Sequence, residues 1–279
     1  MPEIGLSSCG FPLEEESFEK LSAVGIKYVE VSRPFSEHPS LDLDRIALLA
    51  KRYGVELWSY HLPFGGLSTL DIASADEDMR KRSVALWQER IKRVSAIGID
   101  KFIAHPSSEP KGLTPDARKY ELEQSMRSLA ALAQTAAECG SVIAVEDLPR
   151  SCLGNCSEEM LQLLSADSRL RVCFDTNHLL KEDHLGFIEK LADRIVTLHV
   201  SDYDFTDEKH WLPGEGTIDW QSVYNALTEH GYNGAWLYEL GLTDTKKISR
   251  VRELTFEDFV TNASEIFEGR AISVIPRSE

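Results

Sequence analysis

Short runs of apolar, β-branched and aromatic residues alternate along the chain with longer segments whose apolar residues recur at helical spacing. The pattern predicts eight strands, each followed by a helix. We expect strands at residues 3–8, 28–32, 56–62, 101–105, 142–146, 171–175, 195–200 and 235–240. We expect helices at residues 13–24, 43–53, 75–97, 116–139, 158–164, 184–192, 220–230 and 255–267. Five of these helices are followed at once by a glycine, the residue that most easily adopts the left-handed conformation at a helix end: Gly25, Gly54, Gly98, Gly140 and Gly231.

The predicted strands are almost continuously apolar, which is typical of a parallel sheet covered by helices on both faces. Repeated strand–helix units imply such a sheet. The chain has 279 residues, and roughly 250 is usual for one eight-fold α/β barrel. No Pro/Ser-rich linker interrupts it. The sequence therefore predicts an α/β fold, a single-domain (β/α)8 TIM barrel over residues 1–279.

Composition narrows the function classes. No apolar stretch approaches the ~20 residues that span a bilayer, and the N-terminal segment lacks a basic region followed by an apolar run. The five cysteines are scattered without a CxxC pair, so we expect reduced thiols in a cytoplasmic protein without membrane contact. The formal net charge is −16 and no dense Lys/Arg run is present, which makes nucleic acid an unfavourable partner.

Ionisable residues mark the ends of the predicted strands. From the third strand to the eighth, each run ends in a residue that could bind a metal or carry a proton. These six residues are His61, His105, Glu146, Asp175, His199 and Glu239. In a closed parallel barrel all strand C-termini lie on one rim, so residues more than 130 positions apart are expected to meet in one pocket.

A carboxylate at the edge of an apolar core is costly to desolvate unless it is paired or coordinated. Glu146, Asp175, His199 and Glu239 together form a hard, mostly oxygen ligand set, which suits one divalent ion such as Mn²⁺, Mg²⁺ or Co²⁺ and tolerates Zn²⁺. Further imidazoles would shift the preference towards zinc if they also coordinate. Those available are His61, His105, His178 and His210.

The segment 213–220, PGEGTIDW, allows two interpretations. Its glycines could let the backbone approach a ligand or a phosphate closely, or the segment could be a tight turn whose Thr217 or Asp219 caps the next helix. Lys209 and Arg33 are the rim cations best placed to meet a phosphate or carboxylate on a substrate.

Taken together, these pieces resemble the xylose-isomerase-like TIM-barrel superfamily, which includes sugar and sugar phosphate isomerases and epimerases and the endonuclease IV-type enzymes. The resemblance extends over nearly the whole chain, strand by strand. It rests on YVEVS with Glu30, HLPF with His61, VEDLP with Glu146, DTNH with Asp175 and His178, LHVSD with His199, HWLPGEGTIDW with His210, and YEL with Glu239.

By this resemblance, Glu146, Asp175, His199 and Glu239 would hold one divalent metal, and the two glutamates would also move protons. The metal would acidify a C–H beside a ketose carbonyl and stabilise the resulting enediolate. His178 would contact the substrate, and we expect His61, His105, His210, Lys209 and Arg33 to do the same. The family's epimerases often carry an Arg shortly after the position of His199, whereas residues 202–205 here are Asp, Tyr, Asp and Phe.

The endonuclease branch of the resemblance implies three zinc ions. His61, His105 and Glu146 would match the first site, and Glu146, Asp175, His199 and Glu239 the second. His178 and His210 would match the third, together with an Asp two positions before His210. Glu208 stands at that position here, and the acidic charge of the chain opposes binding of a DNA backbone.

The sequence thus predicts a divalent-metal-dependent isomerase or epimerase of a sugar, sugar phosphate or sugar acid. It would act by proton transfer through a metal-bound enediolate, with Glu146 and Glu239 as acid and base. The alternatives are an inosose-type dehydratase or lyase, an endonuclease IV-like zinc phosphodiester hydrolase, and a non-catalytic sugar-binding barrel. The expected partner is a small carbohydrate, and a homo-oligomer is possible by analogy with related barrels.

Overall fold

The computed structural model describes residues 2–65, 69–109, 113–243 and 248–278. Its strands are β1 Ile4–Ser7, β2 Tyr28–Val31, β3 Glu56–His61, β4 Lys101–Ala104, β5 Val142–Glu146, β6 Arg171–Asp175, β7 Ile195–His199 and β8 Trp236–Tyr238. Its helices are α1 Glu15–Ala23, α2 Leu43–Tyr53, α3 Glu77–Ser95, α4 Pro115–Glu138, α5 Ser157–Leu164, α6 His184–Leu191, α7 Trp220–Glu229 and α8 Phe256–Phe267. Every predicted strand and helix is present, and each boundary lies within two residues of its predicted position.

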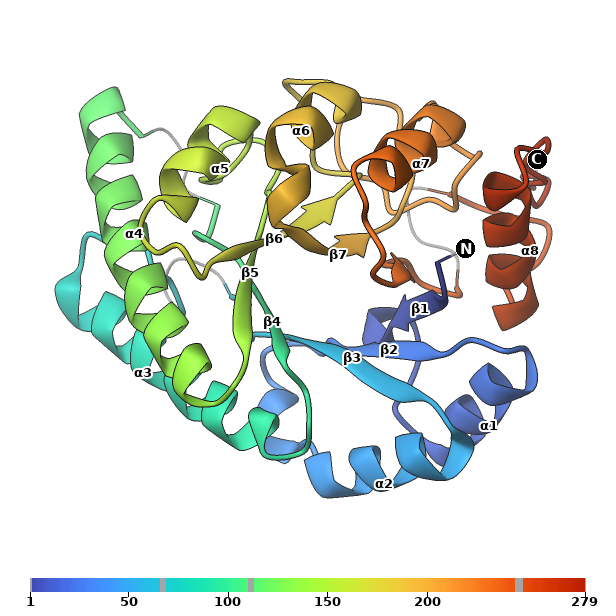
Figure 1. The fold of residues 1–279 in the computed structure, drawn as a ribbon, viewed down its shortest axis with the longest axis horizontal. Helices are drawn as coiled ribbons and strands as arrows, with labels where there is room; N and C mark the ends of the chain where they lie inside the picture. Colours follow the sequence, from blue (N-terminus) through green and yellow to red (C-terminus); the bar gives the residue numbers. More distant parts are fainter. Residues whose placement is uncertain (1, 66–68, 110–112, 244–247, 279) are drawn as a thin grey trace.

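The strands form one parallel sheet in the order β7-β6-β5-β4-β3-β2-β1-β8. Just beyond the end of β7, Val200 bridges to Tyr238 of β8 in parallel: Val200 N donates to Leu237 O and Glu239 N donates to Val200 O. The sheet therefore curls into a nearly closed barrel with the helices outside it (Figure 1), and the predicted TIM barrel is confirmed.

The helix boundaries follow local chemistry. Helix α2 begins after Asp42, whose side chain accepts from Arg45 N, and it ends at Gly54, which has a φ of 67°. All five glycines predicted to follow helices have positive φ. Three short 3-10 helices, Ser8–Gly10, His38–Ser40 and Ala192–Arg194, were not predicted. Among the described residues, no helix has both the length and the apolar character needed to cross a membrane.

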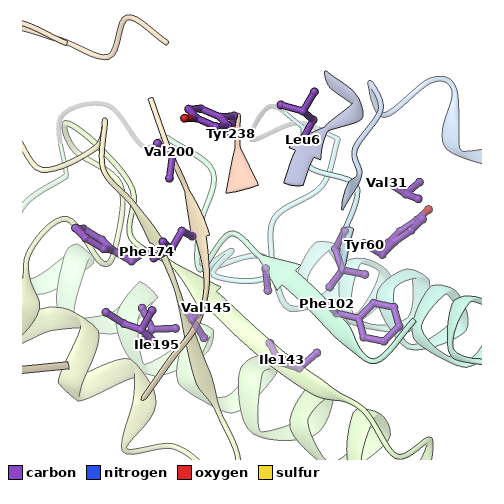
Figure 2. Close-up of a cluster of buried hydrophobic side chains, with 14 of the residues drawn as sticks. Leu6, Val31, Tyr60, Phe102, Ile143, Val145, Phe174, Ile195, Val200 and Tyr238 are labelled. Atoms are coloured by element: carbon purple, nitrogen blue, oxygen red, sulfur yellow. The ribbon is translucent and has the colours of Figure 1, made fainter. Parts of the chain in front are cut away.

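Alternation along the strands separates two layers of side chains. Val145 and Phe174 belong to the large apolar core that packs strands against helices, part of which is drawn in Figure 2. Ala144 and Cys173, one position earlier on the same strands, lie in a separate small cluster with Ile103. Because direction alternates with a period of two, the strand-terminal acids Glu146 and Asp175 continue the row of Ala144 and Cys173. This alternation brings acidic side chains together above the small inner cluster.

Candidate metal centre

The structure brings the predicted metal ligands together. Glu146, Asp175, His199 and Glu239 each offer one ligand atom, and the four atoms lie within 4.8 Å of one another. His199 Nδ1 faces all three acids: it lies 3.1 Å from Glu146 Oε1, 3.3 Å from Glu239 Oε2 and 3.9 Å from Asp175 Oδ2. One imidazole nitrogen and three carboxylate oxygens thus converge on one point from β5, β6, β7 and the residue after β8. We call these four residues the central cluster.

The other nitrogen of His199 is held by Glu30 on β2. His199 Nε2 lies 3.1 Å from Glu30 Oε2, and this fully buried carboxylate also accepts from the hydroxyls of Ser7 and Ser59, at 3.1 and 2.7 Å. An ionised carboxylate can only accept, so Glu30 holds a proton on Nε2. With a cation bound at Nδ1 the ring would be neutral and its lone pair would point towards the acids, which is how a carboxylate behind a metal-binding histidine fixes its tautomer.

The charges of the central cluster are strongly coupled. Burial raises the pKa of Asp175 well above its ordinary value, and repulsion from Glu239 and Glu146 adds to this effect. Burial also acts against ionisation of Glu146 and Glu239. Nearby imidazoles overcome it: His105 and His199 hold the pKa of Glu146 well below its usual range, and His199 lowers that of Glu239 to about 2. Three carboxylates share one imidazole here, so a divalent cation is the fitting counter-charge.

The donor set passes a direct test for a cation. Asp175 Oδ1 accepts from Asn177 N at 2.7 Å, whereas the buried Oδ2 atom has no hydrogen-bond partner within the described part of the chain. A buried polar atom without a hydrogen bond is costly, and Oδ2 lies 3.3 Å from His178 Nδ1 and 3.9 Å from His199 Nδ1. The residues present therefore fit a divalent metal held by the central cluster.

Two further groups of possible ligands flank the central cluster. In the first, Glu146 Oε2 lies 3.2 Å from His61 Nε2 and 3.0 Å from His105 Nε2, so Glu146 joins this group to the central cluster. In the second, His178 Nε2 lies 3.5 Å from Glu208 Oε2, and His210 completes the set. The four histidines predicted to bind substrate therefore lie in groups with metal-ligand geometry. Whether they contact substrate stays a prediction.

A cavity of about 480 Å³ opens above these groups. Glu146 and Glu239 line it, together with His61, His105, His178 and His210. Asp175 and His199 are fully buried beneath it. A ligand in this cavity would meet both predicted proton-carrying glutamates, while the other two ligands remain out of its reach.

The two predicted rim cations, Arg33 and Lys209, do not line this cavity, and their contact with a substrate stays a prediction. Arg33 does not line this cavity: its guanidinium donates to Ser8 O and Phe11 O, at 3.0 and 3.2 Å, and pairs with Glu37 at 2.7 Å. Lys209 Nζ lies 3.8 Å from Asp204 and is also outside the lining. Both charges are taken up by neighbouring protein groups, which the sequence pattern did not reveal.

The glycine-containing segment 213–220 is a turn organised around a buried carboxylate. Asp202 accepts from Gly214 N, Gly216 N and Ile218 N, at 2.8, 3.1 and 3.2 Å, and from the indole of Trp220 at 2.9 Å. A Cβ on Gly216 would come within 2.3 Å of Asp202 Oδ1. The anion that these amides bind is thus part of the protein. The predicted cap is confirmed at Asp219, which accepts from Ser222 N at the start of α7.

Sequence reasoning did not assign a role to two residues of the site. Glu30 entered only as part of a resembling motif, although it occupies the same inward row on β2 as the ligands on other strands. Asn177 Oδ1 accepts from Lys209 N and from His210 N, at 2.9 and 3.5 Å, and so positions the loop that carries His210. The DTNH motif contained this asparagine, but no local signal connects it with a loop more than 30 residues away.

Curated relatives include both sugar epimerases and nucleases. The D-psicose 3-epimerase of Ruminiclostridium cellulolyticum is 25% identical over 233 residues, which are 79% of this chain and 76% of that protein. A probable endonuclease 4 of Thermoplasma acidophilum is 26% identical over 187 residues, 61% of this chain and 62% of that protein. Among the first three relatives, the matched stretch is 62% to 76% of the relative's own length.

Solved structures share the fold over nearly the whole chain. A D-tagatose 3-epimerase-like protein superposes with a TM-score of 0.79 at 24% identity and covers 95% of this chain and 97% of its own. The family model of xylose isomerase-like TIM barrels matches residues 18–253. By the match and the barrel, this chain belongs to the family of xylose isomerase-like TIM barrels.

Proposed function

We propose that this protein is a divalent-metal-dependent isomerase or epimerase of a carbohydrate. The observation that carries the proposal is the convergence of Glu146 and Glu239, together with Asp175 and His199, beneath a cavity large enough for a sugar. Relatives named as sugar epimerases support it. The four residues of the central cluster would hold the cation.

A divalent cation at this site would draw electron density from a sugar carbonyl and so acidify the adjacent C–H. Glu146 would remove the proton from that carbon: the C–H bond breaks, a carboxyl O–H bond forms, and the electron pair moves onto the carbonyl oxygen. Glu239, ionised at rest, would pass on a proton drawn from solvent. Delivered to the same carbon from the other side, this proton gives the epimer; delivered to the former carbonyl carbon, while the hydroxyl proton of the first carbon moves to the carbonyl oxygen, it gives the isomer. Glu146 then releases its proton to solvent, so both carboxylates end the turnover ionised.

The surroundings of Glu146 suit the role of base. His61 and His105 lie against its Oε2 atom, while Oε1 faces His199, so both oxygens are oriented and the carboxylate is kept ionised. Glu239 is less buried and lines the same cavity. The pair therefore combines one deeply held carboxylate and one more accessible carboxylate.

Solvent-deuterium incorporation into a panel of ketoses tests the proposal, with the protein loaded with Mn²⁺. Glu146→Gln and Glu239→Gln should each lower the exchange rate by about 10²–10⁴. Glu229→Gln, at an exposed position of α7, is the matched control and should not change it. Exchange that survives both site substitutions would remove these residues from the proton-transfer role. Loss of mass by one water in the product would indicate the dehydratase alternative instead.

A second candidate, a zinc-dependent phosphodiester hydrolase, is favoured by one specific observation. The histidine groups on either side of the central cluster have the geometry of additional metal sites. The net charge of −16 opposes a DNA substrate. Metal analysis separates the two functions: one bound Mn²⁺ or Mg²⁺ per chain supports the isomerase or epimerase, and three zinc ions per chain, with cleavage of an abasic-site duplex, support the hydrolase.

A further inference from the structure

A second cavity of about 360 Å³ adjoins the one above the central cluster. The two share the lining residues Phe64, His105, His178 and Glu208, so they adjoin along these four side chains. Beyond these shared residues, the second cavity is lined by the loops after β3, β4 and β5 and by Trp87 of α3. We call it the side pocket and define it by residues that line it alone: Leu70, Ile72, Trp87, Ser107, Ser108 and Leu148.

The walls of the side pocket offer mainly apolar contacts. Leu70, Ile72, Trp87 and Leu148 contribute carbon surface. The polar groups among them are already engaged: the hydroxyl of Ser108 lies 2.8 Å from both Gly65 O and Leu70 O, and the indole N–H of Trp87 donates to Pro63 O at 2.8 Å. A ligand group that enters gains apolar burial and meets few polar groups that still need a partner.

The charged residues of the side pocket do not favour an anion. Among the described lining residues, the arginine is Arg150, whose guanidinium lies 2.9 Å from Glu109, 2.8 Å from Asp207 and 3.4 Å from Glu208. One positive charge is surrounded by three carboxylates. A phosphate or carboxylate placed here would have to compete with these carboxylates for Arg150, so the expected occupant is uncharged.

Phe64 lies at the junction of the two cavities. Its ring stacks on His105 with centroids 4.5 Å apart and an angle of 25°, and 46% of the residue remains exposed. One face is thus fixed against a residue of the metal centre, and the remaining exposed surface is available to a ligand that passes between the cavities. Ligand cavities usually measure about 300–1,000 Å³, so the larger cavity alone holds a sugar and leaves the side pocket for a further group.

We propose that the substrate is a ketose with an uncharged, partly apolar substituent, and that the side pocket binds this substituent while the carbonyl end lies at Glu146 and Glu239. The inference rests on the proposed function for the sugar end, but the side pocket itself is tested by binding alone. The proposal excludes, as substrate, a sugar phosphate whose phosphate group occupies the side pocket.

The experiment compares D-fructose and D-psicose with their 1-O-benzyl and 6-O-benzyl ethers and their 1- and 6-phosphates. Both ends of the sugar are substituted so that the comparison covers either orientation of the sugar. Dissociation constants with the Mn²⁺-loaded protein are measured by calorimetry, and deuterium exchange is followed in parallel. One of the benzyl ethers should bind roughly 10- to 100-fold more tightly than its parent ketose, from burial of the ring. The phosphates should bind no better than the parent sugar.

Two variants at one position localise the effect. Ser108→Phe fills the side pocket and should reduce the benzyl-to-parent affinity ratio at least tenfold. Ser108→Ala removes the same hydroxyl contacts without filling the space and should preserve the ratio. If the wild-type protein binds the parent and benzyl ketoses with equal dissociation constants, or binds a phosphate more tightly, the inference is overturned and no variant is needed. Tighter binding of a benzyl ether without deuterium exchange on any sugar would support the side pocket and refute the proposed function.

Discussion

The contact between Glu30 and His199 yields a quantitative prediction about metal affinity. Replacing Glu30 by Gln keeps the shape of the side chain but removes the charge that lies 3.1 Å from His199 Nε2. The hydroxyls of Ser7 and Ser59, which now donate to the carboxylate, would have to share an amide with one acceptor oxygen. The imidazole would lose the partner that fixes its tautomer and strengthens its basicity.

The expected loss follows from the nature of this contact. Partners of metal-binding histidines typically contribute 10–100-fold in metal affinity. Such a change corresponds to about 1.4–2.8 kcal/mol. We expect the upper part of this range, because Glu30 and His199 are fully buried and the lost hydrogen bond involves an ionised acceptor in a region screened from water.

Competition with a chelator measures the affinity for Mn²⁺ in the wild-type protein and the variant. Glu56→Gln, at an exposed position at the start of β3, removes the same charge without touching His199 and is the matched control. The wild-type and Glu56→Gln proteins should agree, and Glu30→Gln should bind more weakly. Unchanged affinity in Glu30→Gln, in a variant with native circular dichroism, would refute the role of Glu30 in orienting His199.

Three further predictions concern the scaffold. Asp202→Ala leaves the amides of Gly214, Gly216 and Ile218 without their acceptor. Since a buried group left without its partner costs about 1–3 kcal/mol, we expect the free energy of unfolding, measured in urea, to fall by about 3–5 kcal/mol. A loss below about 1 kcal/mol would contradict this account. Burial lowers the pKa of His38 to about 4, so the folded state favours the neutral ring; its contribution is complete above about pH 6.5 and is lost as the pH falls towards 4, on the order of 3 kcal/mol. The stability difference between the wild-type protein and His38→Gln should therefore shrink across this range in parallel urea titrations, and a constant difference would show that His38 is not the group responsible. Removal of metal with a chelator should lower the melting temperature. The reason is that an ion at 100 times its dissociation constant stabilises the folded state by about 2.7 kcal/mol. Identical melting curves with and without Mn²⁺ would argue against a metal site in the folded protein.

The fold was predictable because its signals are local. The bounds of β5 and α2 agree with their expected ranges, since an apolar run bounded by polar residues and an amphipathic segment ending at Gly54 each define one element without distant information. The meeting of Glu146 with Glu239 was also predictable, because a parallel barrel brings every strand end to one rim. The structure confirms this convergence and the position of Asp219 as the cap of α7.

Other features depend on contacts that no local pattern specifies. Arg33 was expected at the substrate, but its guanidinium is directed to backbone oxygens of residues 8 and 11 by the packing of the loops after β1 and β2. The glycines of segment 213–220 do not indicate which acceptor their backbone amides bind, and in the structure this acceptor is the carboxylate of Asp202. The side pocket arises only where the loops after β3, β4 and β5 come together with Trp87 of α3.

By itself, the sequence determined the order of strands and helices and the row of acidic and imidazole side chains at the strand ends. The reason is that hydrophobic periodicity and alternation along a strand act over a few residues. Only the tertiary structure decided which of these side chains lie close enough to hold one metal ion and which charged side chains are neutralised by a neighbour. It also decided that Glu30 contacts Nε2 of His199. Those outcomes depend on distances of about 3 Å between residues as many as 169 positions apart, and packing of the whole barrel sets them.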